Sequence, residues 1–282
     1  MKNSRRNFIQ KTALGLAGSV SIPFLSHAAV SEAGTFKTET RLPVGIAGYT
    51  FAKFDVDKSI AMLKRLDLHY LSIKDMHLPL NSNDEKIKEV LTKFTEANVK
   101  IYTAGVIYMK TKAEVDQAFD YTKKTGVNMI VGVPTYDLLD YTEQKVKSMD
   151  IKIAIHNHGP EDKLYPGPQN VYDHVKNRDP RMGLCLDIGH ATRAGANLEK
   201  AVTDYKDRLF DLHIKDVTGA FKDAKAIEIG RGVIDFDALV KVLYKINYKG
   251  VCSIEFEKDM TDPLPGIAES IGFFRGVLSC NS

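Results

Sequence analysis

The chain of 282 residues is 44% hydrophobic and 27% charged, which is typical of a globular protein and excludes a disordered, collagen-like or multi-span membrane protein. Its formal net charge of +3 comes from 39 basic and 36 acidic residues, and four of the basic ones, Lys2, Arg5, Arg6 and Lys11, precede the first acidic residue. Beyond them the charges nearly cancel, so composition gives no support for a nucleic-acid or anionic-membrane partner.

The first 28 residues have the layout of an export signal. Arg5 and Arg6 precede an uncharged stretch that ends in small residues at Ser26 and Ala28, as signal peptidase prefers. The adjacent arginines resemble the twin-arginine signal, whose cargo folds before export. An N-terminal membrane anchor is the alternative, but Pro23 interrupts the apolar run, which is shorter than the roughly 20 residues that a span needs.

We therefore expect a cleaved signal over residues 1–28, a linker without apolar periodicity over 29–40, and one folded domain over 41–282. This layout predicts an exported, periplasmic protein with no stable membrane span after processing.

Apolar runs of strand length alternate with amphipathic stretches of helix length throughout the folded domain. Strands are predicted at Pro43–Thr50, Tyr70–Lys74, Lys100–Val106, Met129–Val133, Ile151–His156, Met182–Asp187, Leu209–Ile214 and Val251–Phe256. Helices are predicted at Asp57–Leu66, Asp84–Ala97, Lys112–Thr122, Asp140–Met149, Gln169–Lys176, Leu198–Tyr205, Phe236–Ile246 and Ile267–Leu278.

Eight strands that alternate with eight helices over about 240 residues favour a (β/α)8 TIM barrel, which typically takes about 250. A doubly wound sheet is the alternative. It is disfavoured because the first strand, Gly45-Ile46-Ala47-Gly48-Tyr49, lacks the third glycine of a phosphate-binding loop.

Strand parity predicts which side chains enter the barrel, because successive residues of a strand face opposite ways. Large apolar residues occupy the helix-facing positions of the last four strands, which leaves polar residues facing inward at their C-terminal ends, where barrel enzymes keep their chemistry. The four polar residues are His156, Asp187, His213 and Glu255.

Each of these residues alone has an ordinary structural interpretation, since a lone strand-end histidine is more often hydrogen-bonded than a ligand and a lone aspartate is often a helix cap. Two imidazoles and two carboxylates that converge without a lysine or arginine would be costly to bury unless a cation lies among them. We therefore expect one divalent metal held by His156, Asp187, His213 and Glu255. Mixed nitrogen and oxygen ligands do not choose among Mn, Zn, Co, Fe or Mg.

Four sequence motifs resemble those of the xylose isomerase-like TIM-barrel superfamily, which includes sugar isomerases, ketose epimerases, inosose dehydratases and a DNA-repair endonuclease branch. They are Asp187-Ile188-Gly189-His190, Leu212-His213-Ile214-Lys215-Asp216, Gly230-Arg231-Gly232-Val233-Ile234-Asp235 and Ile254-Glu255. The resemblance implies that Asp187, His213 and Glu255 bind metal, that Glu255 also moves a proton, and that His190 contacts substrate or a water. It further implies that Arg231 reaches over the site.

The fifth strand departs from the superfamily pattern. Epimerase relatives place there a glutamate that both binds metal and acts as a second base, whereas this chain has Ile155-His156-Asn157-His158. A ligating imidazole is a poor base, so one base remains, and this favours elimination or hydration over epimerisation. His158 has the same parity as His156 and could supply an acid or base, or simply hydrogen-bond near the loop.

Further polar residues at the expected mouth of the barrel are predicted to bind substrate. Lys74 and His77 follow the second strand and Glu257 follows the eighth. Lys74 shares the inward parity of Ser72 and could hold an anionic or keto oxygen, although a surface lysine is an equally good interpretation.

Two classes of function follow. The first is an exported, metal-dependent enzyme that removes a proton next to the carbonyl of a sugar, keto-glycoside or cyclitol, preferred as a lyase or hydratase of 3-keto-glycosides, with isomerase or epimerase activity as the alternative. The second is a non-catalytic barrel that binds carbohydrate, for which a closed ligand set is expected. A DNA-repair nuclease is disfavoured because the third strand lacks the additional histidines of that branch. Only a small carbohydrate is expected as partner.

Overall fold

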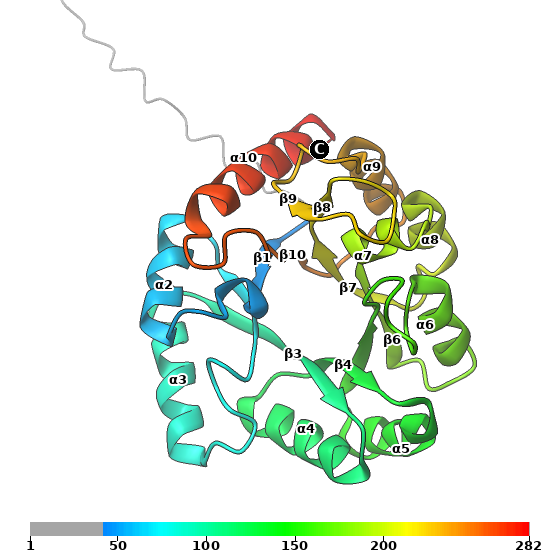
Figure 1. The fold of residues 1–282 in the computed structure, drawn as a ribbon. Coiled ribbons are helices and arrows are strands. Elements are labelled where there is room, and N and C mark those ends of the chain that lie inside the picture. Colours follow the sequence, from blue (N-terminus) through cyan, green and yellow to red (C-terminus); the bar gives the residue numbers. More distant parts are fainter. Residues whose placement is uncertain (1–41, 282) are drawn as a thin grey trace, which may run out of the picture. The chain divides into compact units, whose positions relative to one another are not determined.

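The structure, a computed structural model, describes residues 42–281, so the expected signal and linker lie outside the described residues. Eight parallel strands close into a barrel in the order β1-β10-β7-β6-β5-β4-β3-β2 (Figure 1). Their bounds are β1 Val44–Ala47, β2 Tyr70–Ile73, β3 Lys100–Met109, β4 Met129–Pro134, β5 Lys152–His156, β6 Met182–Asp187, β7 Leu209–Ile214 and β10 Cys252–Ile254. The predicted (β/α)8 barrel is confirmed, and the doubly wound alternative is wrong because β1 pairs with both β2 and β10.

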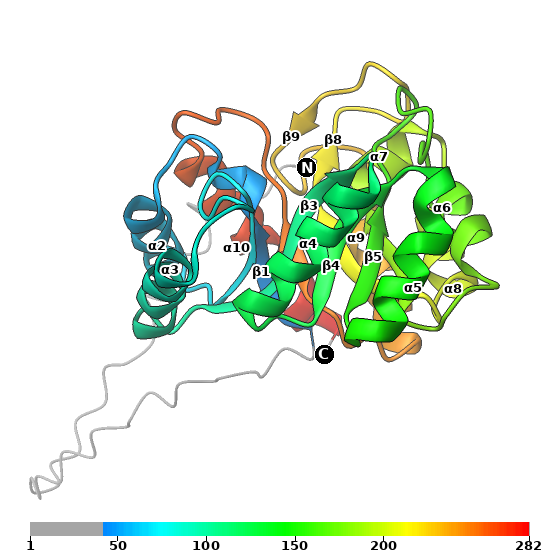
Figure 2. The same ribbon diagram turned by 90° about the horizontal axis from the view of Figure 1, so that it is seen from below.

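Helices surround the barrel on its outside (Figure 2). They are α2 Val56–Arg65, α3 Asp84–Glu96, α4 Lys112–Thr125, α5 Leu139–Met149, α6 Pro168–Val175, α7 Ile188–Arg193, α8 Leu198–Asp204, α9 Phe236–Lys245 and α10 Leu264–Asn281. Several begin where a side-chain oxygen accepts a hydrogen bond from the amide three residues later, as Asp55 does for α2 and Asn83 does for α3. No helix among residues 42–281 combines the length and apolar character that a membrane span requires.

The first strand is shorter than predicted because the chain turns at Gly48. A short 3-10 helix, η1 (Gly48–Phe51), follows β1 and carries Tyr49 over the barrel end. A Cβ at Gly48 would lie 2.5 Å from the backbone oxygen of Ser72, so only glycine lets η1 approach β2 this closely. A second 3-10 helix, η2 (Tyr136–Leu138), precedes α5.

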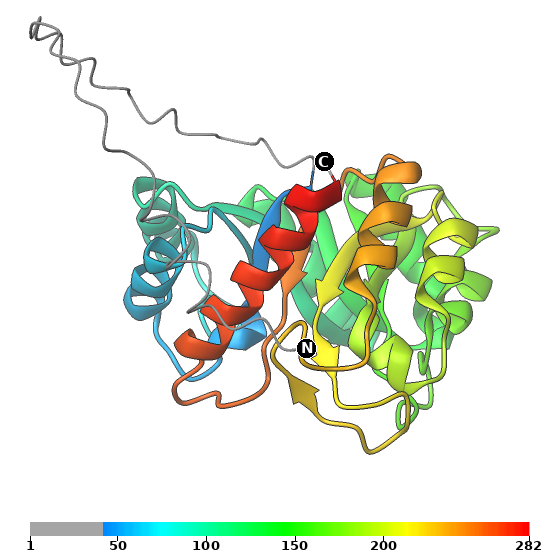
Figure 3. The same cartoon turned by 90° about the horizontal axis from the view of Figure 1, so that it is seen from above.

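Two further elements absent from the sequence prediction lie at the same end of the barrel. Helix α7 begins directly after β6, and a small antiparallel sheet of β8 (Asp216–Val217) and β9 (Ala226–Ile227) follows β7. Figure 3 shows β8 and β9 beyond the end of the barrel. These elements shape the space above the C-terminal ends of β5, β6, β7 and β10.

A polar layer crosses the barrel interior below those strand ends. The Tyr102 hydroxyl lies 3.2 and 3.1 Å from the two carboxylate oxygens of Asp211 and 2.5 Å from Ser253 Oγ. Burial raises the pKa of Asp211 to about 7. Asp211 and Ser253 lie two residues before His213 and Glu255, so this layer is the floor on which those two side chains stand.

Candidate active site

The structure brings the four predicted ligands together at the ends of four neighbouring strands. His156 ends β5, Asp187 ends β6, His213 lies on β7 and Glu255 follows β10. All four are buried, with exposures of 2%, 0%, 1% and 5% respectively. One ligand atom from each lies within 4.8 Å of those of the others. We call these four residues the strand-end cluster.

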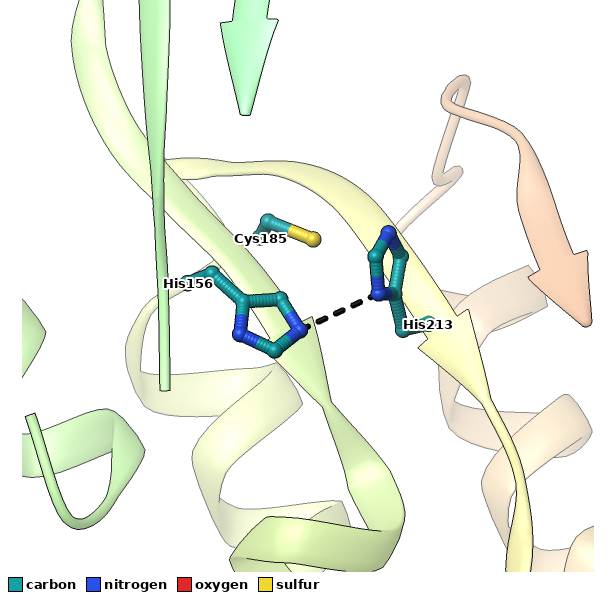
Figure 4. Close-up of side chains that lie close together, drawn as sticks. All are labelled: His156, Cys185 and His213. Carbon is teal, nitrogen blue, oxygen red and sulfur yellow. Dashed lines mark hydrogen bonds between the residues drawn. The ribbon is translucent and has the colours of Figure 1, made fainter. Parts of the chain in front are cut away.

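The two histidines of the strand-end cluster face each other. His156 Nε2 lies 3.0 Å from His213 Nδ1, as Figure 4 shows. His156 Nε2 is also 3.5 Å from Asp187 Oδ2, and His213 Nδ1 is 3.2 Å from Glu255 Oε2. The imidazole nitrogens and carboxylate oxygens therefore point at one small volume.

A lysine lies in the strand-end cluster, which corrects the expectation that no cationic side chain is present. Lys215 Nζ is 3.0 Å from Asp187 Oδ2, 2.7 Å from Glu255 Oε2 and 3.0 Å from Glu257 Oε1, and its side chain is only 3% exposed. Lys215 follows β7 with the parity of His213, so the same alternation that predicts His213 inward also predicts Lys215 inward. The signal was present in the sequence one residue beyond the predicted strand.

Lys215 alone does not balance the carboxylates around it. Asp187, Glu255 and Glu257 together carry up to three negative charges around one ammonium group, and a divalent cation would bring the total to zero. Asp187 Oδ2, fully buried, accepts no hydrogen bond of good geometry from any described residue. The cluster therefore fits a divalent ion, with His156, Asp187, His213 and Glu255 as its ligands.

Cys185 is a further donor near the two histidines. A ligand atom of each of His156, Cys185 and His213 also lies within 4.8 Å of the other two (Figure 4). Burial, with neighbouring carboxylates, holds the pKa of the Cys185 thiol well above its usual value, so the sulfur is a protonated, weak ligand. The set with two carboxylates fits a metal better.

Burial and neighbouring charges shift the pKa values of Glu255 and Lys215 in opposite directions, whereas burial dominates at His156. Burial lowers the pKa of His156 to about 3, so this ring is neutral, as a metal ligand must be. Burial raises the pKa of Glu255, but Lys215 and His213 more than offset this and hold it well below its ordinary value. Burial lowers the pKa of Lys215, and the carboxylates around it reverse the effect, so the side chain is an ammonium ion.

A cavity of about 390 Å³ opens above the strand-end cluster. We call it the cluster cavity. Beside His156 and Glu255, its lining includes four residues predicted to act on substrate, Lys74, His158, His190 and Glu257, together with Tyr49, Val106 and Tyr108. This volume is within the range of about 300–1,000 Å³ that small-molecule sites occupy.

Two histidines at the edge of the cluster cavity are held in place by neighbours. His158 Nε2 lies 2.8 Å from the Tyr108 hydroxyl, and its ring centre is 4.5 Å from that of His156. His190 Nδ1 lies 3.2 Å from a guanidinium nitrogen of Arg193, and its backbone amide donates to Asp187 Oδ1. Burial lowers the pKa of both rings, that of His190 to about 4.

Lys74 lies at the cavity edge as well. Its Nζ donates to the backbone oxygen of Val106 at 2.5 Å and lies 3.4 Å from Asp75 Oδ1. Burial raises the pKa of Glu257, the second carboxylate of the cavity, and Lys215 partly opposes this shift.

The structure does not bring the other two predicted substrate residues to the cavity. His77 is buried under η1, where its Nε2 lies 3.3 Å from both Ser59 Oγ and the Phe51 backbone oxygen. Arg231 points outward and pairs with Glu269 of α10 at 2.5 and 2.7 Å. Packing below η1 and an outer ion pair thus account for these two side chains.

The fold and the cluster define a class, TIM-barrel proteins whose polar side chains converge at the C-terminal ends of the last strands. Within that class, the sequence profile described as "xylose isomerase-like TIM barrel" matches residues 56–277. The chain belongs to this family.

One curated relative and two solved structures illustrate what the chain is similar to, the structures in fold alone. The inosose isomerase of Bacillus subtilis is 28% identical over 182 residues, which cover 62% of this chain and 63% of that relative, so the match spans less than two thirds of its length. The crystal structure of an IOLI protein with a bound zinc atom has a TM-score of 0.74 at 18% identity and covers 86% of this chain and 99% of its own. The apo 3-keto-D-glucoside 4-epimerase of E. coli has a TM-score of 0.68 at 18% identity, with coverages of 83% and 99%.

Proposed function

We propose that this chain is a metal-dependent enzyme that removes a proton next to the carbonyl of a sugar, keto-glycoside or cyclitol, and that it acts as a lyase or hydratase of 3-keto-glycosides. The observation that carries the proposal is the open cluster cavity above four convergent ligand side chains. A purely structural metal site would be closed. The relatives named for inosose and for a 3-keto-glucoside support a carbonyl-bearing carbohydrate as the substrate class.

A divalent metal held by the strand-end cluster would polarise the substrate carbonyl and so make the neighbouring proton more acidic. Glu255 carries the base function in this proposal. Its carboxylate is ionised, because Lys215 and His213 offset the effect of burial, and it lines the cavity.

Residues that line the cluster cavity can accept and donate every proton that the elimination moves. Glu255 takes the α proton as the C–H electron pair forms the enolate, and this pair then expels the glycosidic oxygen from the β carbon. His158 or His190 gives the leaving oxygen its proton, so the products are an unsaturated keto sugar and a free alcohol. Addition of water to the unsaturated sugar is the hydratase direction of the same chemistry.

Epimerisation is the second candidate, and Glu257 favours it. This carboxylate lines the same cavity as Glu255 and is 31% exposed in its side chain, so it could return a proton where the fifth strand offers only His156. Two carboxylates on different sides of a bound sugar would suffice for inversion.

An incubation of methyl 3-keto-glucoside in deuterated water separates the two reactions. Elimination releases methanol, whereas epimerisation returns an intact, inverted glycoside with deuterium at the carbon next to the carbonyl. Intact labelled product without methanol would overturn the lyase proposal and support epimerisation, and no reaction by metal-loaded protein would count against both.

The base assignment has its own test. Glu255→Gln keeps the shape of the side chain but removes the ionised carboxylate, so we expect activity to fall about 10²–10⁴-fold with the fold intact. Glu269→Gln, on the outer surface of α10, is the matched control. Full activity of the Glu255→Gln variant would show that another residue is the base.

Export belongs to the same proposal. Arg5, Arg6 and the small residues at Ser26 and Ala28 support it. Replacement of both arginines by lysine should leave the full-length protein in the cytoplasm, whereas the native leader should deliver a shorter protein to the periplasm.

A further inference from the structure

A second cavity lies beside the cluster cavity. Its volume is about 460 Å³, and the β8–β9 sheet, α7 and the loops after β5 and β10 supply its walls. His190 and Glu257 line both cavities, so the two spaces meet at these side chains. We call this second space the basic cavity, because its charged lining consists of four cations and two carboxylates: Arg193, Lys215, Lys225, Lys258, Glu161 and Glu257.

Most of the cations in the basic cavity already have acidic partners. Arg193 lies 2.7 Å from Glu161 Oε1, and Lys258 Nζ lies 2.8 Å from Glu228 Oε1. Lys215 is held by the carboxylates of the cluster. Lys225 pairs with no carboxylate of the described chain, so it is the uncompensated positive charge of this cavity.

The remaining wall of the basic cavity is apolar. Val217 and Ala224 are 1% and 5% exposed, and Ala226 pairs with Val217 in the small sheet. Arg193 also donates to the backbone oxygen of Lys222, at 3.0 Å from its Nε, which ties α7 to the loop between β8 and β9. An apolar wall beside a positive charge suits a ring that carries an anionic group.

The two cavities meet at His190 and Glu257, and this meeting point connects the basic cavity to the proposed reaction. A single sugar ring above the strand-end cluster would leave the basic cavity empty. A glycoside would instead span both spaces and place its glycosidic oxygen near His190, one of the two groups proposed to protonate the leaving oxygen.

Resting on the proposed function, we infer that the substrate is a two-part glycoside whose keto-sugar ring occupies the cluster cavity and whose second unit, a ring that bears a carboxylate, occupies the basic cavity beside Lys225. Carboxylate recognition by Lys225 then sets which glycosides are processed. Simple methyl glycosides are poor substrates because they use only one of the two cavities.

Binding of unoxidised glycosides tests this inference without any reaction. Titration calorimetry measures the affinity of the zinc-loaded, full-length protein for three probes. They are methyl, 4-carbamoylphenyl and 4-carboxyphenyl β-D-glucoside. We expect the carboxyphenyl compound to bind about three- to tenfold more tightly than its neutral carbamoyl match, and the methyl compound to bind most weakly.

Two variants assign the effect to the basic cavity. Lys225→Glu should abolish the preference for the carboxylate and leave methyl glucoside binding unchanged, whereas the control Lys249→Glu, an exposed change of the same charge on the loop before β10, should change neither. Ala226→Phe should weaken both aryl glucosides and spare methyl glucoside.

Equal affinity for the three probes, no measurable binding of any of them, or the same loss of preference in Lys225→Glu and Lys249→Glu would overturn the inference. Failure of the proposed function is measured separately, as no turnover of either 4-carboxyphenyl or methyl 3-keto-glucoside by the zinc-loaded protein. Equal turnover of the two compounds would retain the function and reject the second site.

Discussion

At the scale of single residues, Lys215 decides the charge balance of the site. Its ammonium group contacts Asp187, Glu255 and Glu257, two of which are also proposed metal ligands or bases. In the metal-free protein Lys215→Met leaves buried carboxylates without a cation, so we expect the free energy of unfolding to fall by about 3–5 kcal/mol.

Added zinc should recover part of that loss, because a divalent ion supplies the missing positive charge. Denaturant unfolding with and without zinc measures both values. Lys74→Met is the control, since Lys74 lines the same cavity but pairs with the exposed Asp75, and it should cost less than about 1 kcal/mol. A deficit of equal size with and without zinc would contradict this account.

Asp211, on the floor below the cluster, predicts a pH dependence of stability. Burial raises its pKa to about 7 in the folded, metal-free protein, against an ordinary value of 3.8. The unfolded chain therefore holds fewer protons at this group between those values, and the free energy of unfolding falls as pH rises from about 4 to about 7. The fall is at most about 4 kcal/mol, from about three pKa units.

Asp211→Asn should lack this component of the pH dependence, because an amide does not ionise. Comparison of the two proteins by denaturant unfolding at pH 5 and pH 8, with a chelator present, isolates the contribution of Asp211 from that of the other groups. Parallel pH dependence of the two proteins would show that Asp211 ionises normally.

At the scale of structural elements, the Asp216 carboxylate fixes the loop that contains the motif Gly230 to Asp235. Asp216 accepts hydrogen bonds from the backbone amides of Val217, Gly230, Gly232 and Ile234 at 2.8 to 3.2 Å. A Cβ at Gly232 would collide with Asp216 itself. The glycine motif thus shapes a loop around a buried carboxylate and directs Arg231 away from the cavity.

Loss of this carboxylate should release the loop. We expect Asp216→Ala to lower the free energy of unfolding by at least about 3 kcal/mol, because four backbone amides, one of them in a buried hydrogen bond and three in partly buried ones, lose their shared acceptor together. Hydrogen exchange should accelerate most at Gly230, Gly232 and Ile234. Exchange that accelerates equally across the barrel would indicate general destabilisation instead.

The alternation of side chains along the strands predicts most residues of the site. The other residues lie past the strand ends or in very short strands, where this pattern gives no prediction. The pattern placed His156, Asp187, His213 and Glu255 on one inner surface because a buried parallel strand leaves little freedom to its side chains. Lys215 follows the same rule but lies past the end of β7. The β8–β9 sheet has only two residues a strand, too short for any periodicity, so the basic cavity and its walls were not predictable.

Arg231 illustrates the limit of motif matching. Its motif predicted a side chain above the site, but its direction depends on Glu269 of α10, almost forty positions along the chain. Such a contact between distant segments leaves no local signal in the sequence. His77 likewise follows β2 at the mouth, but packing below η1 takes it out of the cavity.

At the scale of the whole molecule, metal binding should stabilise the barrel as a unit, because the ligands come from β5, β6, β7 and β10. A ligand at about 100 times its Kd contributes about 2.7 kcal/mol to stability. For a domain of this size we expect the Tm to rise by about 5–10 °C when zinc is added to chelator-treated protein.

Elemental analysis of untagged protein should then find about one divalent ion per chain. His213→Ala removes one ligand and is expected to lose both the ion and most of the Tm shift. An unchanged Tm in the native protein and a metal content near zero would rule out the cluster as a metal site.

The contact between Arg193 and His190 determines which ring nitrogen of His190 carries the proton. A guanidinium nitrogen can only donate, so Nδ1 of His190 must accept, and the neutral ring carries its single proton on Nε2. In this tautomer neither ring nitrogen has a free lone pair, so the imidazole can give a proton to a departing oxygen but cannot take one from carbon. Of the two groups proposed to protonate the leaving oxygen, His190 on α7 thus has a proton to give at Nε2, on the opposite side of the reaction from the base, Glu255, beside β10.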